Sequence, residues 1–272
     1  MALKIQEVAA PTRLFVGMYG TPGSGKSFGA AAMGARWVKR KGGELSIWVF
    51  DTEDSWGWLT GKLSAVGIKL VRADASEQAD RGVADLREFL VEAHKAKAGI
   101  VCVDSLTHIV EKCDADYLDY LRNRPKRAKD EMEASDYGPA RKDFKKLCSQ
   151  MLTSKLDLII CGRHGLEYGV VGGKNVPIGH KMKAADFGYE PDLLIEAKRT
   201  EEKESKFANE VSTWHTYTVD KDRSGTLSSR GPIRTKEDGK EMQAFGTVAK
   251  GFDPFFDFLL GEPEEQAQEG GE

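Results

Sequence analysis

The residues with the clearest chemical meaning form a short glycine-rich run near the start of the chain. Its spacing is G-x-x-x-x-G-K-S. In such a run, backbone N–H groups turn inward around a phosphate, and the helix that follows directs its positive end at the same anion. A lysine adds a mobile charge, and a serine hydroxyl suits Mg2+, which takes oxygen ligands. We therefore predict a Walker A loop for ATP and Mg2+, rather than a chance match in a turn. The loop consists of Gly20, Thr21, Pro22, Gly23, Ser24, Gly25, Lys26 and Ser27.

A second motif supplies a carboxylate that could reach the same metal ion. Residues 100–104 are an apolar run that ends in Asp104 and is followed by Ser105. An acid at the end of a buried strand is the Walker B arrangement, which places a carboxylate beside Mg2+. Such runs are common alone, but this one follows a Walker A loop in an alternating strand and helix pattern. The sequence therefore predicts that Asp104 joins Ser27 at the metal.

These motifs need a parallel sheet to position them, and the chain shows the strand and helix alternation of such a sheet. Strand patterns cover residues 13–19, 46–51, 69–72, 100–104 and 156–161. Helical patterns cover residues 27–40, 76–97, 106–122 and 139–154. Continuous apolar character in the first, fourth and fifth strand patterns indicates strands that are buried on both faces. We therefore expect an α/β fold with a mainly parallel central sheet flanked by helices.

The pattern changes after Gly162. A glycine- and lysine-bearing stretch at 164–188, to which no element is assigned, is followed by strand patterns at 192–198 and 213–219. A charged segment separates these two strands, so we expect them to extend the sheet in antiparallel fashion. Residues 262–272 are too polar to pack and are expected to form an acidic disordered tail. No linker divides the remainder, so residues 1–261 are predicted to be one domain.

Composition narrows the class of protein. The formal net charge is −3, and the tail holds five negative charges, so the body is slightly positive without being a generally basic coat for nucleic acid. The absence of an apolar run of about 18 residues and of a signal-peptide pattern predicts no membrane association and a cytoplasmic location. The cysteines lack metal-binding spacing and are expected to be thiols, with Cys102 and Cys161 buried.

The end of the second strand pattern resembles a known family. Asp51-Thr52-Glu53 stands where RecA-like ATPases carry a D-A-E or D-T-E triplet. In that family the glutamate activates the attacking water, so the resemblance implies that Glu53 is the general base of ATP hydrolysis. It also implies a RecA-like P-loop NTPase fold. The alternative for Glu53 is a solvated acidic turn that caps the next helix.

A later element is similar to the K-x-R-x-G signature of RecA-like hexameric helicases and RadA-type recombination ATPases. It reads Lys221-Asp-Arg223-Ser-Gly225 at the end of a late strand pattern. In those families the lysine and arginine reach the γ phosphate of a neighbouring subunit, and such an arginine finger stabilises charge on the transferred phosphoryl group. The resemblance implies that Lys221 and Arg223 act in trans, in a homo-oligomer with ATP at its subunit interfaces. The alternative is a charged β-turn.

The fifth strand pattern runs into Gly162-Arg163-His164. RecA-like proteins place a polar residue there that senses the γ phosphate and couples it to the adjacent loop. The family more often uses glutamine, so the resemblance leaves Arg163 and His164 as alternatives for this sensor.

Two further segments resemble phage-encoded RecA-fold ATPases, which are related to RadA and associated with single-strand annealing and recombination. The first is His180-Lys-Met-Lys183, and the second runs from Tyr189 to Glu196. This resemblance implies single-stranded DNA as a partner.

Basic residues gather in the segments that face DNA in RecA-like folds. They are Arg122, Arg124, Lys126, Arg127, Lys129, Lys174, Lys181 and Lys183, with Tyr168, Phe187 and Tyr189 nearby. Cations that follow phosphates and aromatic rings that stack on bases suit sequence-tolerant binding of single strands. The alternative is a solvated charged loop that Asp130, Glu131 and Glu133 balance.

The leading hypothesis is therefore an ATP-hydrolysing, DNA-binding RecA-like ATPase from a phage or prophage, acting in recombination, annealing or repair. A second hypothesis is a nucleotide-switched assembly or regulatory protein that gates a protein partner without DNA. A small-molecule kinase is disfavoured, because such enzymes usually carry an arginine-rich lid and need no finger between subunits. The absence of an N-K-x-D guanine-reading motif favours ATP over GTP.

Overall fold

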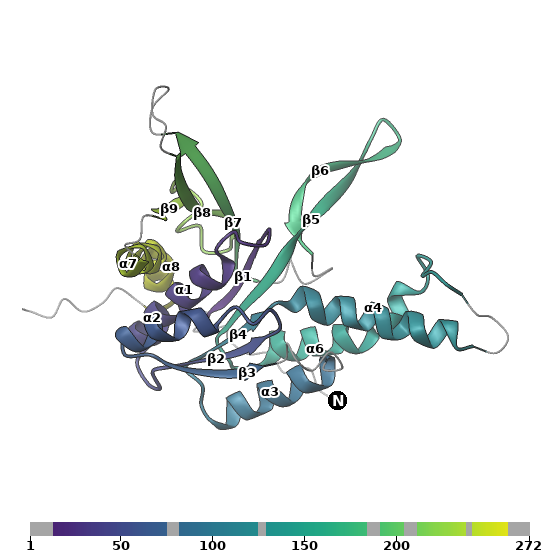
Figure 1. The fold of residues 1–272 in the computed structure, drawn as a ribbon, viewed down its shortest axis with the longest axis horizontal. Helices are drawn as coiled ribbons and strands as arrows, with labels where there is room; N and C mark the ends of the chain where they lie inside the picture. Colours follow the sequence, from purple (N-terminus) through teal and green to yellow (C-terminus); the bar gives the residue numbers. More distant parts are fainter. Residues whose placement is uncertain are drawn as a thin grey trace, which may run out of the picture.

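One β-sheet runs through the molecule (Figure 1). The computed structural model describes residues 13–74, 82–124, 129–183, 191–203, 211–237 and 241–260. Within these ranges the strands follow the order β3-β2-β4-β5-β1-β7-β8-β9, and β6 pairs with β5 outside this order. The strands are β1 (Phe15–Gly20), β2 (Ser46–Asp51), β3 (Lys69–Asp74), β4 (Ile100–Asp104), β5 (Leu158–Val171), β6 (Lys174–Met182), β7 (Leu193–Lys203), β8 (Val211–Asp222) and β9 (Ile233–Lys236).

The centre of the sheet is parallel. β1 lies between β5 and β7, and β4 lies between β2 and β5, with every one of these pairs parallel. β8 then runs antiparallel to β7, and β9 runs antiparallel to β8. The predicted architecture is therefore confirmed: an α/β domain with a mainly parallel central sheet and an antiparallel extension. The carboxyl ends of β1, β2 and β4 meet at one edge of the sheet, where ligands bind in open α/β folds.

Helices cover both faces of the sheet (Figure 1). On one face lie α1 (Lys26–Lys41), α2 (Thr60–Ala65), α7 (Glu241–Gly251) and α8 (Asp253–Leu260). On the other face lie α3 (Val83–Lys95), α4 (Leu106–Arg122) and α6 (Lys142–Thr153). Two short elements complete the set, a 3-10 turn η1 (Gly57–Leu59) and α5 (Tyr137–Ala140). Each face of the sheet thus has its own hydrophobic core.

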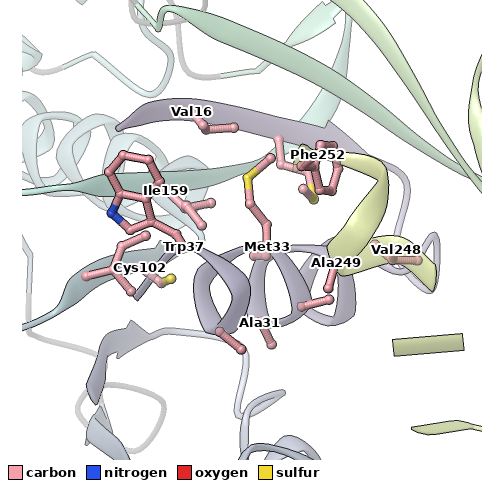
Figure 2. Close-up of a cluster of buried hydrophobic side chains, with 14 of the residues drawn as sticks. Val16, Ala31, Met33, Trp37, Cys102, Ile159, Val248, Ala249 and Phe252 are labelled. Atoms are coloured by element: carbon pink, nitrogen blue, oxygen red, sulfur yellow. The ribbon is translucent and has the colours of Figure 1, made fainter. Parts of the chain in front are cut away.

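Helix α1 carries the phosphate-binding loop, and small residues let it lie close against the sheet. A Cβ atom added at Gly34 would meet the Ile47 side chain at 3.3 Å. Figure 2 shows Met33 and Trp37 of α1 with Ile159 of β5 and with Phe252 from the C-terminal helical segment. Each large apolar side chain buried in this way contributes roughly 1.5–3 kcal/mol. Burial therefore fixes the start of α1 relative to the strands.

The stretch at 164–188, to which the sequence assigned no element, holds the largest difference from expectation. β5 continues from the sheet through Val171, turns at Gly172 and Gly173, and returns as β6. The two glycines have φ angles of 59° and 78°. Positive φ at both central positions is what a two-residue hairpin turn requires. The Gly-Gly pair between apolar runs was the overlooked signal. This β5–β6 hairpin projects from the body of the molecule (Figure 1).

The other differences concern helices. The pattern at 139–154 overlaps two helices, α5 and α6. The pattern at 76–97 corresponds to the shorter α3, and residues 75–81 lie outside the described ranges. η1, α2, β9, α7 and α8 were not predicted. The proposed tail, 262–272, also lies outside the described residues.

Two findings concern membranes and cysteines. No helix in the described part of the chain combines the length and apolar character needed to cross a bilayer. Cys102 and Cys161 are fully buried, as expected. Burial raises the pKa of both thiols well above its usual value.

Candidate functional site

The glycine-rich loop joins the carboxyl end of β1 to the start of α1. Gly23 and Gly25 have φ angles of 75° and 91°. Side chains with a Cβ rarely adopt this left-handed region, so glycine is required at both turns. Lys26, only 4% exposed, donates from Nζ to the carbonyl oxygen of Thr21 at 3.0 Å. The loop has the strand–turn–helix context that phosphate binding needs.

The predicted loop residues differ in exposure. Gly20 is the last residue of β1, and both Gly20 and Ser24 are buried. Ser27 is half-buried in the first turn of α1. The three residues at the tip of the loop are exposed, and they are Thr21, Pro22 and Gly23.

The structure brings Ser27 and Asp104 together, as the two motifs predicted. Ser27 Oγ donates to Asp104 Oδ2 at 2.5 Å. The same carboxylate oxygen accepts from Trp56 Nε1 at 2.9 Å and from Ser55 Oγ at 3.3 Å. The other oxygen, Oδ1, is buried and has no hydrogen-bond partner in the described structure. A fully buried carboxylate with one unpartnered oxygen calls for a cation or its water shell.

Burial raises the pKa of Asp104, with a smaller contribution from nearby Glu53, while hydrogen bonds from Ser27 and Trp56 oppose the rise. The polar side-chain atoms of Ser27 and Asp104 are oxygens, which are the ligands that Mg2+ prefers. Within the described residues no group of three or more His, Cys, Asp or Glu side chains could hold a metal ion. Mg2+ typically takes one or two carboxylates together with substrate phosphates. Ser27 and Asp104 therefore fit a magnesium site that nucleotide phosphates complete.

Glu53 lies beside this pair, just beyond the end of β2. Its Oε1 accepts from Ser105 Oγ at 3.2 Å and from Arg163 Nε at 3.3 Å. His108 Nε2 lies 3.6 Å from the same oxygen. The Glu53 side chain is 22% exposed, so water can reach the carboxylate while its neighbours hold it in place. This is the position a base needs if it is to orient an attacking water.

The first acid of the triplet, Asp51, organises the turn that follows β2. Asp51 is fully buried. It accepts from the backbone N–H groups of Glu53, Ser55 and Trp56 at 3.2, 3.3 and 3.0 Å. Asp51 thus shapes the loop that brings Glu53, Ser55 and Trp56 to Asp104.

The two sensor candidates lie on different sides of the site. Arg163 reaches Glu53, whereas His164 Nε2 contacts Glu196 Oε1 at 2.8 Å. The His164 ring also stacks on Tyr19, with ring centroids 5.6 Å apart. Although burial raises the pKa of Glu196, hydrogen bonds from Lys198 and His164 lower it overall. Of the two candidates, the structure therefore places Arg163 in the site.

The predicted finger residues, Lys221 and Arg223, lie far from the loop of their own subunit. β8 ends at Asp222, which pairs with Leu193 at the amino end of β7. Arg223 Nη1 contacts Asp192 Oδ1 at 3.0 Å. The loop is at the opposite, carboxyl end of β1, whose six residues span about 20 Å. At this position Arg223 does not reach a γ phosphate bound at the loop of its own chain.

The basic cluster after α4 is largely paired where the structure describes it. Arg122 contacts Asp119 at 3.3 Å, and Lys129 contacts Glu133 at 3.0 Å and Asp136 at 3.2 Å. The Arg124 guanidinium lies over a ring, that of Tyr120. Lys126 and Arg127 lie outside the described residues.

The second basic group lies on the β5–β6 hairpin. Lys174 begins β6, Lys181 is near its end, and Lys183 follows it, contacting Glu111 at 2.8 Å. Exposed apolar side chains share the hairpin, and they are Leu166, Val170, Val171 and Ile178. The Tyr168 side chain, Phe187 and Tyr189 lie outside the described residues.

Sequence reasoning missed several residues that complete the site. Ser55 and Trp56 reach Asp104, and His108 contacts Thr52 Oγ1 at 2.8 Å through Nδ1. His215 and Tyr217 of β8 contact the glycine-rich loop. The closeness of Ser55 and Trp56 to the D-T-E triplet was a usable signal. No such signal existed for His215 and Tyr217 of β8, because their contacts with the loop join residues about 190 positions apart in the chain.

Comparisons with known proteins concern the fold alone. No protein-family model and no curated protein sequence matches the chain. Among solved structures, the chain is similar to a KaiC-like protein from the hyperthermophilic archaeon Pyrococcus horikoshii OT3. The identity is 16%, the match covers 76% of this chain and 79% of that protein, and the TM-score is 0.44.

Proposed function

We propose that the protein is a RecA-like ATPase that hydrolyses ATP with Mg2+ and acts on single-stranded DNA in phage-type recombination, annealing or repair. One observation carries the hydrolytic part. The buried Asp104 carboxylate contacts Ser27 of the glycine-rich loop, and Glu53 lies next to it. Residues suited to bind the phosphates, the metal ion and the attacking water thus lie together at the carboxyl ends of the parallel strands.

The residues divide the chemistry between them. Backbone N–H groups of the loop and the start of α1 bind the phosphates, and Lys26 turns its ammonium from Thr21 to the β and γ phosphates. Ser27 and Asp104 hold Mg2+, which when bound neutralises charge on the phosphates. Glu53 accepts a proton from the attacking water. Arg163 holds Glu53 and senses the γ phosphate at the same point.

The finger belongs to a second subunit in this proposal. Because Lys221 and Arg223 lie at the opposite edge of the sheet from the loop, they complete the site of a neighbour in a homo-oligomer. There the Arg223 guanidinium stabilises negative charge on the transferred phosphoryl group. An isolated subunit is then a poor ATPase.

The DNA part rests on the β5–β6 hairpin. β5 passes Arg163 in the site and continues directly into the hairpin that carries Lys174 and Lys181. Positive side chains on a projecting hairpin suit the phosphate backbone of DNA. DNA bound to the hairpin would be linked to Arg163 directly through β5. The proposed compartment is the cytoplasm, that of the host if a phage encodes the protein.

Phosphate release from purified protein tests the proposal. We expect MgATP turnover that single-stranded DNA stimulates strongly at low salt and less at higher salt, because DNA binding releases counterions. Lys26→Ala should abolish turnover. Turnover that DNA leaves unchanged would refute the DNA part and favour a protein-gated switch. A wild-type protein that releases no phosphate with or without DNA would refute the ATPase.

A further inference from the structure

Two side chains of β8 contact backbone carbonyl oxygens of the glycine-rich loop. His215 Nδ1 lies 3.1 Å from the carbonyl oxygen of Ser24, and Tyr217 donates its hydroxyl to the carbonyl oxygen of Gly25 at 3.0 Å. A carbonyl oxygen only accepts, so the first contact requires a proton on His215 Nδ1. The two residues are two positions apart on a strand and therefore point to the same face. Two consecutive carbonyls of the loop thus meet two donors from one face of β8.

The approach between β8 and the loop is too close for ordinary side chains. A Cβ atom at Gly25 would lie 2.7 Å from His215 Nδ1, and one at Gly29 would lie 2.4 Å from the Tyr217 ring. Tyr217 is fully buried and His215 largely so, with a side chain 17% exposed. Burial raises the pKa of the Tyr217 hydroxyl, which keeps it protonated as a donor.

His215 is itself supported from its far side. Its Nε2 lies 3.6 Å from Glu237 Oε2, and Arg199 Nε lies 3.3 Å from the same oxygen. The chain of contacts runs from β7 through the residue after β9 to the loop. The antiparallel extension, rather than the parallel core, thus supplies the donors under the loop.

We propose that His215 and Tyr217 are positioning residues for nucleotide binding, which hold the phosphate-binding loop open by its outward-facing carbonyls. A phosphate nest needs successive N–H groups to point inward, and each peptide unit that points its N–H inward points its C=O outward. Donors under the Ser24 and Gly25 carbonyls stabilise this peptide orientation before a nucleotide arrives. The inference rests on the proposed function, because it concerns how that site binds MgADP and MgATP.

Calorimetric titration of the purified full chain with MgADP tests the inference without requiring hydrolysis or DNA. His215→Leu and Tyr217→Phe each remove one donor, and the second keeps the ring against Gly29. We expect each to raise the Kd about three- to tenfold, a change worth one hydrogen bond. His215→Asn keeps an N–H near the position of Nδ1 and should bind within about twofold of wild type. Thr216→Val, on the opposite face of β8, is the matched control.

The outcomes separate a positioning role from a structural one. Weaker binding in His215→Leu, restored in His215→Asn, with folded protein in each case, supports the inference. Variants that melt at lower temperature yet bind MgADP as tightly as wild type would overturn it. A His215→Asn variant as weak as His215→Leu would do the same. If wild type itself binds neither MgADP nor MgATP, the proposed function falls as well.

Discussion

At the scale of single residues, the site is organised around one buried charge. Asp104 has no exposure, yet three donors converge on a single oxygen and leave the other without a partner. Burial disfavours the ionised form, which is why the pKa of Asp104 is raised. Because the buried charge of Asp104 costs stability, an uncharged residue at this position would make the fold more stable.

Asp104→Asn should therefore stabilise the nucleotide-free protein in a pH-dependent way. The folded protein holds the Asp104 proton more tightly than the unfolded chain, so ionisation costs stability as pH rises through the raised pKa. The free energy of unfolding of the variant, minus that of wild type, should increase between about pH 4 and pH 7. Urea denaturation at both pH values measures it. Asp54→Asn, an exposed acid, is the control, and an equal difference at both pH values would contradict the argument.

Glu53→Gln should separate nucleotide binding from hydrolysis. The amide keeps the shape of the side chain but cannot accept a proton from water, so turnover should fall about 10²- to 10⁴-fold while the Kd for MgADP stays unchanged. Asp54→Asn, one residue along the same loop, should keep its activity. If both variants lose the same small fraction of activity, Glu53 is part of an acidic turn and not a base.

At the scale of elements, strand ends explain why the core of the site was predictable. Ser27, Glu53 and Asp104 lie at or beyond the carboxyl ends of three strands whose patterns are visible in the sequence. Parallel strands place their carboxyl ends at one edge, so those three residues had to meet. The contacts of His215 and Tyr217 depend instead on the register of β8 against β7. Register between distant strands is set by packing, which no local pattern records.

The β5–β6 hairpin can be removed as a unit. Gly165 pairs directly with Lys181, so replacing residues 166–180 with Asn-Gly should close a two-residue turn and leave Arg163 in place. We expect basal phosphate release to persist and stimulation by single-stranded DNA to be lost. A milder variant, Lys174→Ala with Lys181→Ala, should lower the salt dependence of DNA binding by about two units of slope. Unchanged DNA stimulation in the deletion variant would place the DNA contacts elsewhere.

At the scale of the whole molecule, the glycine-rich loop and the proposed finger, Lys221 and Arg223, lie at opposite ends of the sheet strands. Lys26→Ala protein keeps the finger but loses the loop lysine, and Arg223→Ala protein does the reverse. Each alone should release phosphate at least about 100-fold more slowly than wild type. An equal mixture should recover activity, up to about a quarter of wild type when subunits mix at random around a heterologous contact. A mixture no more active than its parts would mean that Arg223 does not act in trans.

In the proposed homo-oligomer, the separation of loop and finger gives each open row of subunits a head and a tail. In an open row of subunits, the loop at one end has no finger and the finger at the other end has no loop. A pair of subunits would then contain one complete site, and a longer row would always contain one fewer site than subunits. Only a closed ring gives each subunit a working site. The rate of ATP turnover per subunit therefore reports whether the ring is closed. It rises with the length of an open row and reaches its full value when the ends join.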